Sequence, residues 1–159
     1  LGRIWEHSRF RSPYLRHTLW DEGYAVDTLE TAVDWAQLPQ AVDAIETAIR
    51  DAVPSLPVHV FTHMSHIYPQ GASVYTSYIF ANGQDYDETL SHWRAMKAAA
   101  SRAVVENGGT ISHQHGVGRD HAPYLGVEKG ALGLKALHAL TTHFDPDGVL
   151  NPGVLLEDQ

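Results

Sequence analysis

The sequence predicts an α+β fold in which the elements follow the order β-α-β-β-α-β, with an additional helix at each end of the chain. Three observations lead to this prediction. Stretches of β-forming residues alternate with two helical stretches, two of the strands are separated only by a short turn, and an extended segment follows the second of these helices. We expect the strands to form an antiparallel sheet with helices on one face.

The first part of the chain is predicted to contain an irregular lead-in, a short helix, a strand and an amphipathic helix, at residues 1–12, 14–22, 24–33 and 39–53. Pro13 suits the first turn of the short helix, and Gly23 ends it. The amphipathic helix is indicated by apolar residues that recur every three or four positions, at Val42, Ile45, Ile49 and Val53.

The second part is predicted to contain two strands, a long helix, a fourth strand or extended loop and a final helix, at residues 58–67, 72–81, 87–106, 110–115 and 127–143. Along the second of these strands the side chains alternate, so that one face is mostly apolar and the other has hydroxyl groups. The apolar face contains Val74, Thr76, Tyr78 and Phe80, and the other contains Ser73, Tyr75, Ser77 and Ile79. This element order is that of a ferredoxin-like sheet, whose second face is free to cover something else.

Composition narrows the classes of function. The chain has 159 residues, a net charge of −8 and no cysteine. The negative charge argues against nucleic-acid partners and against a strongly anionic membrane surface, and the lack of cysteine excludes disulfides, thiolate nucleophiles and cysteine-ligated zinc. No apolar run approaches the roughly 20 residues that span a bilayer. We expect one domain over residues 1–159. Because Leu1 is not an initiator methionine, we expect this domain to belong to a longer protein. We expect that protein to be cytoplasmic or membrane-peripheral.

The segment after the long helix, GGTISHQHGVGR, is the strongest candidate for a functional site. His113 and His115 are two residues apart, so in an extended backbone their side chains project from the same face. The neighbouring glycines let a backbone approach a bulky partner closely. Two titratable rings in such a setting are typical of an active-site wall, and the alternative interpretation is a turn with two surface histidines.

A metal site is not expected, although histidines are frequent. His59 and His63 fall on one face of their strand and His66 on the other, which argues against all three converging on one ion. The sequence also has neither a G-x-G-x-x-G fingerprint nor a Walker motif, so nicotinamide and P-loop enzymes are disfavoured.

Tyr75 and Arg16 each have two interpretations. Tyr75 lies in the middle of a strand, where it is either a packing residue or the acid–base partner of a histidine such as His115. Arg16 is either a surface charge or a clamp for a carboxylate or phosphate.

Four separated segments resemble one family. PYLRHTLW, SHIYPQGASVYTSYIF, NGGTISHQHGVGRDHAPYL and FDPDGVLNPG occur in the order found in the C-terminal domain of FAD-linked oxidases, a part of the p-cresol methylhydroxylase and vanillyl-alcohol oxidase superfamily, and are most similar to its alkyldihydroxyacetonephosphate synthase branch. The resemblance covers residues 10–156. It implies a ferredoxin-like domain that caps a flavin, with FAD held mainly by a separate N-terminal domain of the same parent chain.

The resemblance also implies roles for individual residues. Tyr75 matches a tyrosine that transfers protons in the synthase branch. His113 and His115 match the outer rings of a Ser-His-His-His-Gly motif, whose middle position here is Gln114. A glutamine side chain does not titrate, so a role that needs the middle ring does not apply to this chain.

Arg16 matches an arginine that contacts the substrate, and Asn151 falls in a segment that lies near the flavin in relatives. The implied reaction exchanges the acyl group of an acyl-dihydroxyacetone phosphate for an alkyl group through a flavin N5 adduct, which forms an ether lipid precursor. The implied partners are the FAD-binding domain and a small-molecule or lipid-phosphate substrate, and a homodimer is left open.

A second branch of the superfamily contains the D-2-hydroxyacid dehydrogenases. Their motifs, Gly-Asp-Gly-Asn-x-His and Gly-Glu-His-Gly-x-Gly, provide metal ligands. Tyr75 stands here in place of the histidine and Gln114 in place of the glutamate, so the set is broken at two positions. An FAD-dependent oxidase of a 2-hydroxyacid or another alcohol remains the alternative enzyme, and a cap fragment without activity of its own is the non-enzyme alternative.

Overall fold

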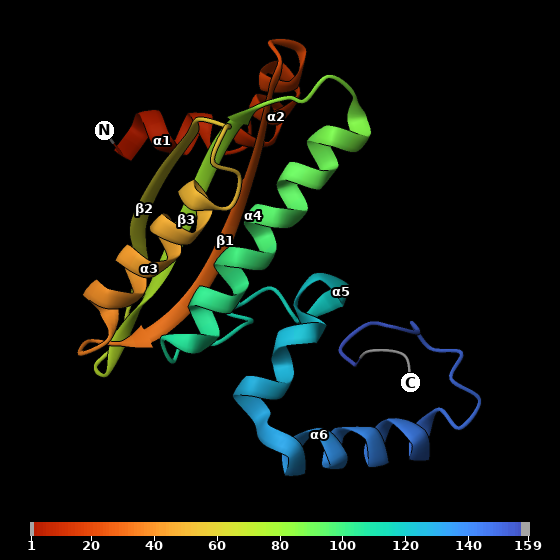
Figure 1. Cartoon of the computed structure of the whole chain (residues 1–159). Helices are drawn as coiled ribbons and strands as arrows, with labels where there is room; N and C mark the ends of the chain where they lie inside the picture. Colours follow the sequence, from red (N-terminus) through yellow and green to blue (C-terminus); the bar gives the residue numbers. More distant parts are fainter. Residues whose placement is uncertain (1, 157–159) are drawn as a thin grey trace.

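The computed structural model describes residues 2–156 and has an antiparallel sheet at its centre (Figure 1). Over these residues the sheet has three strands, β1 (Tyr24–Asp34), β2 (Val58–Ile67) and β3 (Gly71–Ala81), in the order β1-β3-β2. Helices α3 (Leu38–Asp51) and α4 (Tyr86–Glu106) lie against each other on one face of the sheet. The α+β class, the antiparallel pairing and the placement of these helices are therefore confirmed.

Of the two alternatives predicted for residues 110–115, a fourth strand or an extended loop, the structure does not have the strand. The segment follows the open edge of β1, and its Thr110 N–H donates to the Ala32 carbonyl at 3.2 Å. The next amide, of Ile111, donates to a carboxylate of the C-terminal helix instead, and Gln114 has a φ of 66°. A backbone with such a residue does not stay extended, so a loop takes the place of the strand that would complete a ferredoxin-like sheet.

The N-terminal lead-in is helical where an irregular segment was predicted for residues 1–12. Helix α1 covers Gly2–Ser8 and helix α2 covers Ser12–Asp21. No proline or glycine interrupts the chain between the start of α1 and Pro13, so nothing opposes helix formation there. The stop predicted at Gly23 is confirmed, because this glycine has a φ of 86°.

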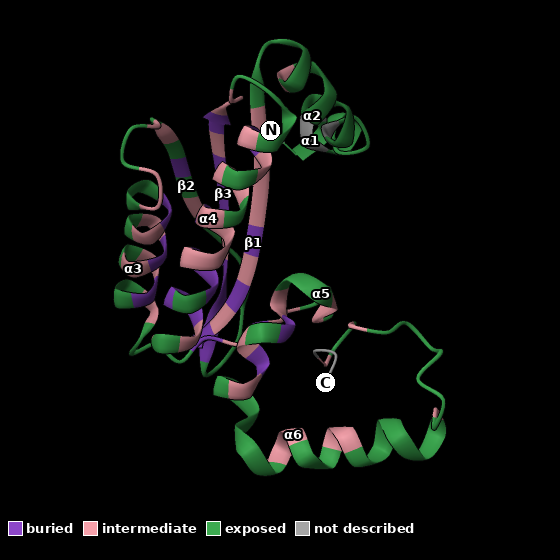
Figure 2. Cartoon of the chain, turned by 45° about the vertical axis from the view of Figure 1, so that its right-hand side comes forward, coloured by how far each residue is buried: buried purple, intermediate pink, exposed green. Residues whose placement is uncertain are grey.

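The C-terminal part projects away from the sheet. It contains α5 (Gly118–His121), a short 3₁₀ turn (Ala122–Tyr124) and α6 (Leu125–Phe144). The helix predicted over residues 127–143 is confirmed, with a break at Gly130, where φ is 67° and ψ is 171°. Most of α6 and the segment after it is exposed (Figure 2).

The hydrophobic core lies between the sheet and the pair α3 and α4. Two residues of the predicted apolar stripe, Ile45 and Ile49, are fully buried, whereas Val42 is half-buried. The predicted apolar face of β3 is confirmed as the face that meets the helices. Its fully or almost fully buried members are Val74, Thr76, Tyr78 and Phe80.

Gly109 fixes the place where the loop leaves α4, and we expect Gly109→Ala to destabilise the protein by roughly 1–3 kcal/mol. A Cβ atom at this position would lie 2.6 Å from the Thr31 hydroxyl and 3.0 Å from a Val104 methyl group. The Thr31 hydroxyl is buried and donates to the Thr110 carbonyl at 2.8 Å, so it has little room to move. Urea denaturation measures the effect. Gly2→Ala, where a Cβ meets open space, is the control, and equal midpoints for the two variants would contradict the expectation.

Candidate functional site

The sheet face opposite α3 and α4 has polar and aromatic side chains, and we call it the open face. In the register of the sheet, Tyr75 of β3 lies between Glu30 of β1 and His63 of β2. The ring centroids of Tyr75 and His63 are 5.1 Å apart. The hydroxyl groups predicted for this face of β3 are therefore present, and histidines reach it from β2 and from the loop after α4.

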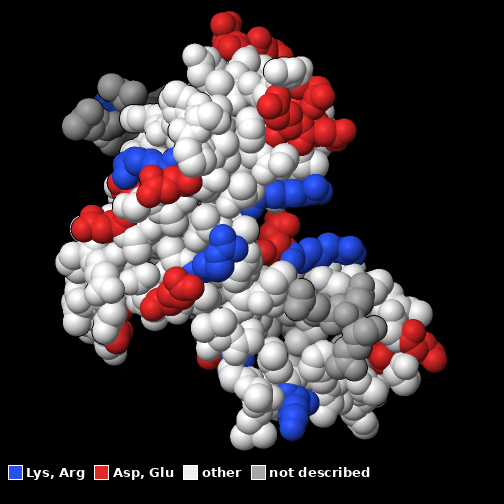
Figure 3. All heavy atoms as spheres, viewed as in Figure 1, with Lys and Arg blue, Asp and Glu red and all other residues white. Residues whose placement is uncertain are grey.

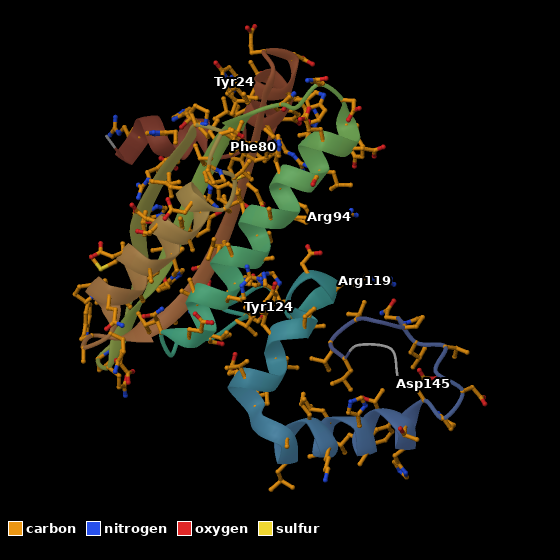
Figure 4. All side chains as sticks on the ribbon, viewed as in Figure 1. Tyr24, Phe80, Arg94, Arg119, Tyr124 and Asp145 are labelled. Atoms are coloured by element: carbon orange, nitrogen blue, oxygen red, sulfur yellow. The ribbon has the colours of Figure 1, made fainter. Side chains whose placement is uncertain are left out.

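A cavity of about 880 Å³ begins on the open face and continues around the edge of β1 toward α4. Its volume is in the range of small-molecule sites. Arg16 of α2 and Tyr75 of β3 both line it, so the structure brings these two predicted residues to one cavity. Tyr24 and Phe80, labelled in Figure 4, mark its position at the end of the sheet next to α2. Apolar and aromatic side chains form much of the lining, among them Leu15, Leu19, Trp20, Phe61, Ile79 and Trp93.

Tyr75 is half-buried, and its hydroxyl donates to the Thr28 hydroxyl of β1 at 3.3 Å. The uncharged Thr28 hydroxyl thus holds the Tyr75 phenol above the sheet, and this hydroxyl can itself donate a hydrogen bond to another group. This geometry leaves the Tyr75 oxygen able to exchange a proton with a molecule in the cavity.

His113 is bound at both ring nitrogens. Its Nδ1 lies 3.1 Å from Oε1 of Glu30, and its Nε2 lies 3.0 Å from the Tyr68 hydroxyl. The side chains of His113 and Glu30 are 12% and 13% exposed, so water screens their interaction only weakly. Neither Glu30 nor Tyr68 was identified from the sequence. Glu30 and Thr28 lie on the same polar face of their strand, and the alternation of polar and apolar side chains along this strand is the sequence signal that could have identified Glu30.

His115 is exposed and lies against the edge of β1. Its Nε2 lies 3.3 Å from the backbone carbonyl of Glu30, and its Nδ1 lies 2.8 Å from the carbonyl of Gly116. The predicted pair of Tyr75 and His115 is therefore held at two nearby points of β1. Tyr75 is bound to Thr28 and His115 to Glu30, two positions further along the strand.

The prediction that His66 faces away from His63 is wrong. A register shift between Met64 and Ile67 brings His66 to the open face, where its backbone N–H donates to the Ser73 hydroxyl at 2.8 Å. Among residues 2–156, no group of three or more His, Cys, Asp or Glu side chains is arranged to hold a metal ion.

A half-buried ionic cluster supports β1 from the helix side. Oδ2 of Asp27 accepts hydrogen bonds from the Tyr78 hydroxyl at 3.0 Å, from the Trp93 indole at 2.7 Å and from the Lys97 ammonium at 3.0 Å. Burial alone would raise the pKa of Asp27, but the Lys97 charge and these donors lower it below its ordinary value. Burial and the neighbouring Asp27 charge raise the pKa of Tyr78. Lys97 also donates to the Thr28 carbonyl at 2.8 Å and so connects the cluster to the strand under Tyr75.

We expect Asp27→Asn to destabilise the protein at neutral pH and to have a smaller effect in acid. The pKa of Asp27 is lower in the folded protein than in the unfolded chain, where it is about 3.9. Its ionisation therefore contributes stability that is present above that value and is lost as the pH falls through the folded-state pKa. Urea midpoints of the two proteins between about pH 7 and about pH 3 measure the difference. A difference that stays constant over this range would contradict the expectation.

Arg16 is exposed on α2 and lines the cavity, whereas Asn151 lies in the segment after α6. That segment is at the opposite end of the molecule from α2, beyond Asp145 in Figure 4. Asn151 has a φ of 50°, and its carbonyl accepts a hydrogen bond from the Val154 amide at 3.2 Å. The structure does not bring Asn151 to Tyr75, and its predicted contact with a cofactor stays a prediction.

On the face shown in Figure 3, acidic side chains gather at the top of the view, and side chains of both signs lie near one another in the middle. Over this face, an anionic group would be recognised by a single cation rather than by a broad positive field. No helix in residues 2–156 has both the length and the apolar character needed to cross a bilayer.

These features define an α+β domain in which Tyr75 of the sheet and Arg16 of α2 line one open cavity, and in which histidines lie on the same face of the sheet. The chain belongs to the family of FAD linked oxidases, C-terminal domain, whose model matches residues 1–155. Two relatives are similar over 98% of this chain, the alkyldihydroxyacetonephosphate synthases of Dictyostelium discoideum (29% identical) and Trypanosoma brucei brucei (26% identical). The chain spans 25% of the length of each, so it corresponds to one part of these larger flavoenzymes.

A solved structure of an alkyldihydroxyacetonephosphate synthase has the same fold, with a TM-score of 0.63 and 22% identity over 94% of this chain and 24% of the synthase chain. A further similarity is local. Glycolate oxidase subunit GlcD of Bacillus subtilis is 49% identical over 50 residues, which cover 31% of this chain and 11% of that subunit.

Proposed function

We propose that this chain is the substrate-facing C-terminal domain of an FAD-dependent enzyme that exchanges the acyl group of an acyl-dihydroxyacetone phosphate for an alkyl group. The observation that carries the proposal is the shared cavity of Arg16 and Tyr75, with His115 held nearby on β1. The similarity to two synthases over 98% of the chain supports the same reaction class.

The open face is better suited to the flavin ring and its substrate than to the pyrophosphate of FAD. The cavity offers flat aromatic walls and hydroxyl groups, as a planar ring and its substrate require. The sequence contains no G-x-G-x-x-G loop of the kind that holds a dinucleotide pyrophosphate. We infer that a separate domain of the same polypeptide holds most of FAD, and that this chain by itself binds FAD weakly or not at all.

When bound, the flavin supplies the electrophilic and redox chemistry of the reaction. The exchange breaks the bond between substrate C1 and the acyl oxygen, so that the acyl group leaves as a carboxylate. It forms a bond from C1 to the oxygen of the incoming alcohol, which releases one proton, and there is no net oxidation. Tyr75 and His115 move protons at C1 and at the alcohol. Arg16 binds the phosphate through its planar guanidinium group.

The test uses the full-length enzyme with FAD bound. Flavin absorbance is followed without oxygen after addition of palmitoyl-dihydroxyacetone phosphate and then of a long-chain alcohol. We expect the flavin to bleach with the acyl ketone and to recover with the alcohol as an ether forms. Bleaching by D-2-hydroxyacids, with no response to the acyl ketone, would overturn the proposal.

The second candidate is oxidation of a 2-hydroxyacid, which the local similarity to glycolate oxidase subunit GlcD favours. In that reaction His115 would remove the hydroxyl proton, and the flavin, when bound, would supply the acceptor for the hydride lost from the same carbon. Tyr75 and Gln114 occupy the positions of metal ligands in that branch, so such a reaction would proceed here without those two ligands. The absorbance experiment distinguishes the two candidates.

A further inference from the structure

We propose that Glu30 is a positioning residue for the site, and that it holds His113 in the tautomer that connects it to Tyr68. This inference rests on the proposed function for its catalytic consequence, while the geometry behind it belongs to the chain itself. Glu30 is a member of β1, a strand hydrogen-bonded to β3 along its length, so its Cα position is well fixed.

Glu30 lies beside each of the three residues predicted to be catalytic. It lies directly opposite Tyr75 in the register of β1 and β3. Its carboxylate faces Nδ1 of His113 at 3.1 Å, and its backbone carbonyl faces Nε2 of His115 at 3.3 Å. The Glu30 side chain is only 13% exposed, and a carboxylate that is this little exposed needs polar partners.

The same carboxylate oxygen has further polar neighbours. Oε1 of Glu30 accepts a hydrogen bond from the Ser65 hydroxyl at 2.8 Å, and Nδ1 of His66 lies 3.8 Å away. Ser65 is bound in turn to the Ser73 hydroxyl at 2.6 Å. These contacts fix the Glu30 side chain from the β2 side, so that it points to His113 in one orientation.

The direction of the hydrogen bonds follows from the donor inventory. An ionised carboxylate can only accept, so the His113 nitrogen that faces Glu30 carries the proton. In the neutral ring Nε2 is then an acceptor, and the Tyr68 hydroxyl donates to it. Tyr68 thus donates a hydrogen bond to His113, and His113 donates one to Glu30. A carboxylate fixes the tautomer of the histidine in a Ser-His-Asp triad in the same way.

Tyr68 is the accessible end of this series. Tyr68 is 37% exposed, and its ring lies nearly parallel to that of His66 with the ring centroids 6.3 Å apart. Transfer of the Tyr68 proton to Nε2 leaves a phenolate and an imidazolium next to the Glu30 carboxylate, which stabilises the positive charge. When the phenolate accepts one proton from a substrate, Tyr68 is neutral and His113 stays an imidazolium. The groups return to their starting state when Tyr68 gives a proton to the product and Nε2 then returns its proton to the Tyr68 oxygen. Tyr68 is thereby a second proton-exchanging group, separate from Tyr75.

The first test measures the tautomer of His113 by NMR on the ¹⁵N-labelled chain at about pH 8.5, where imidazole groups are generally neutral. We expect the proton on Nδ1 in the native chain and a clear loss of that form in Glu30→Ala. The matched control is Glu46→Ala, which removes a half-buried carboxylate paired with Arg50 on the helix side of the sheet. His113→Gln assigns the signal.

The second test measures exchange kinetics in the full-length enzyme with FAD bound. We expect Glu30→Ala to lower kcat by at least tenfold with less than about a threefold change in KM, since positioning affects the proton transfer rather than substrate binding. Glu46→Ala should keep both constants. A native His113 with its proton on Nε2, or a tautomer and a kcat that match those of Glu46→Ala, would overturn the proposal. If the native enzyme lacks the exchange reaction, the proposed function fails, while the NMR result still decides the role of Glu30.

Discussion

Tyr75→Phe in the full-length flavoenzyme is expected to lower kcat by roughly 10²–10⁴, the range associated with loss of a general acid–base group. The substitution removes only the hydroxyl, whose hydrogen bond to Thr28 is 3.3 Å long. The free energy of unfolding should therefore fall by no more than about 1 kcal/mol. The ring, its contact with His63 and the shape of the cavity are retained. Steady-state kinetics and urea denaturation of the same preparation measure the two effects together.

Tyr14→Phe is the matched control, because its phenol is 67% exposed on α2 and does not line the cavity. It should keep both kcat and stability. If Tyr75→Phe retains kcat within about threefold of the native value, proton transfer does not depend on this hydroxyl. In that event Tyr75 is a packing residue, and the proton-transfer role passes to His115 or Tyr68.

Ile45→Ala is expected to destabilise the domain by about 2–5 kcal/mol. Ile45 is fully buried between α3 and the sheet, in the same hydrophobic core as Tyr78 and Val74. The loss combines the transfer free energy of the removed methyl and methylene groups with the cost of the cavity that remains. Because native domains are only marginally stable, a change of this size removes a large share of the total. The measurement is the urea midpoint at constant m-value.

Val42→Ala gives the comparison on the same helix. Val42 belongs to the same apolar stripe, but it is half-buried, so we expect less than half of the loss seen at Ile45. Equal losses of unfolding free energy at the two positions would mean that α3 is rotated about its own axis relative to the orientation described here.

Much of the fold follows from local patterns. The alternation along residues 72–81 predicts which face of β3 meets the helices, and the spacing of Ile45 and Ile49 predicts the buried side of α3. The long helix after β3 was also predicted, and its start is fixed by Asp85, whose side chain accepts a hydrogen bond from the Glu88 amide at 2.8 Å. Such signals are local, because the residues that determine them are close in sequence.

Elements that depend on distant contacts were not predicted correctly. The segment 110–115 has the composition of a strand, but its Ile111 amide is bound by Glu128, seventeen positions further along the chain. His66 was placed on the wrong face, because the register shift after Met64 arises from pairing with β3 and not from the residues of β2 alone. A period of two predicts faces only while the register is unbroken.

The sequence by itself determined the family, the α+β class and the candidate residues Arg16, Tyr75, His113 and His115, since each depends on residue identity within a motif or a repeating pattern. Only the tertiary structure decided that Arg16 and Tyr75 line one cavity and that Glu30 contacts both histidines. Glu30 and His113 are 83 positions apart, so no local pattern relates them. Sheet pairing and the course of the loop after α4 bring them together, because each chain segment takes the position in which its polar groups find partners.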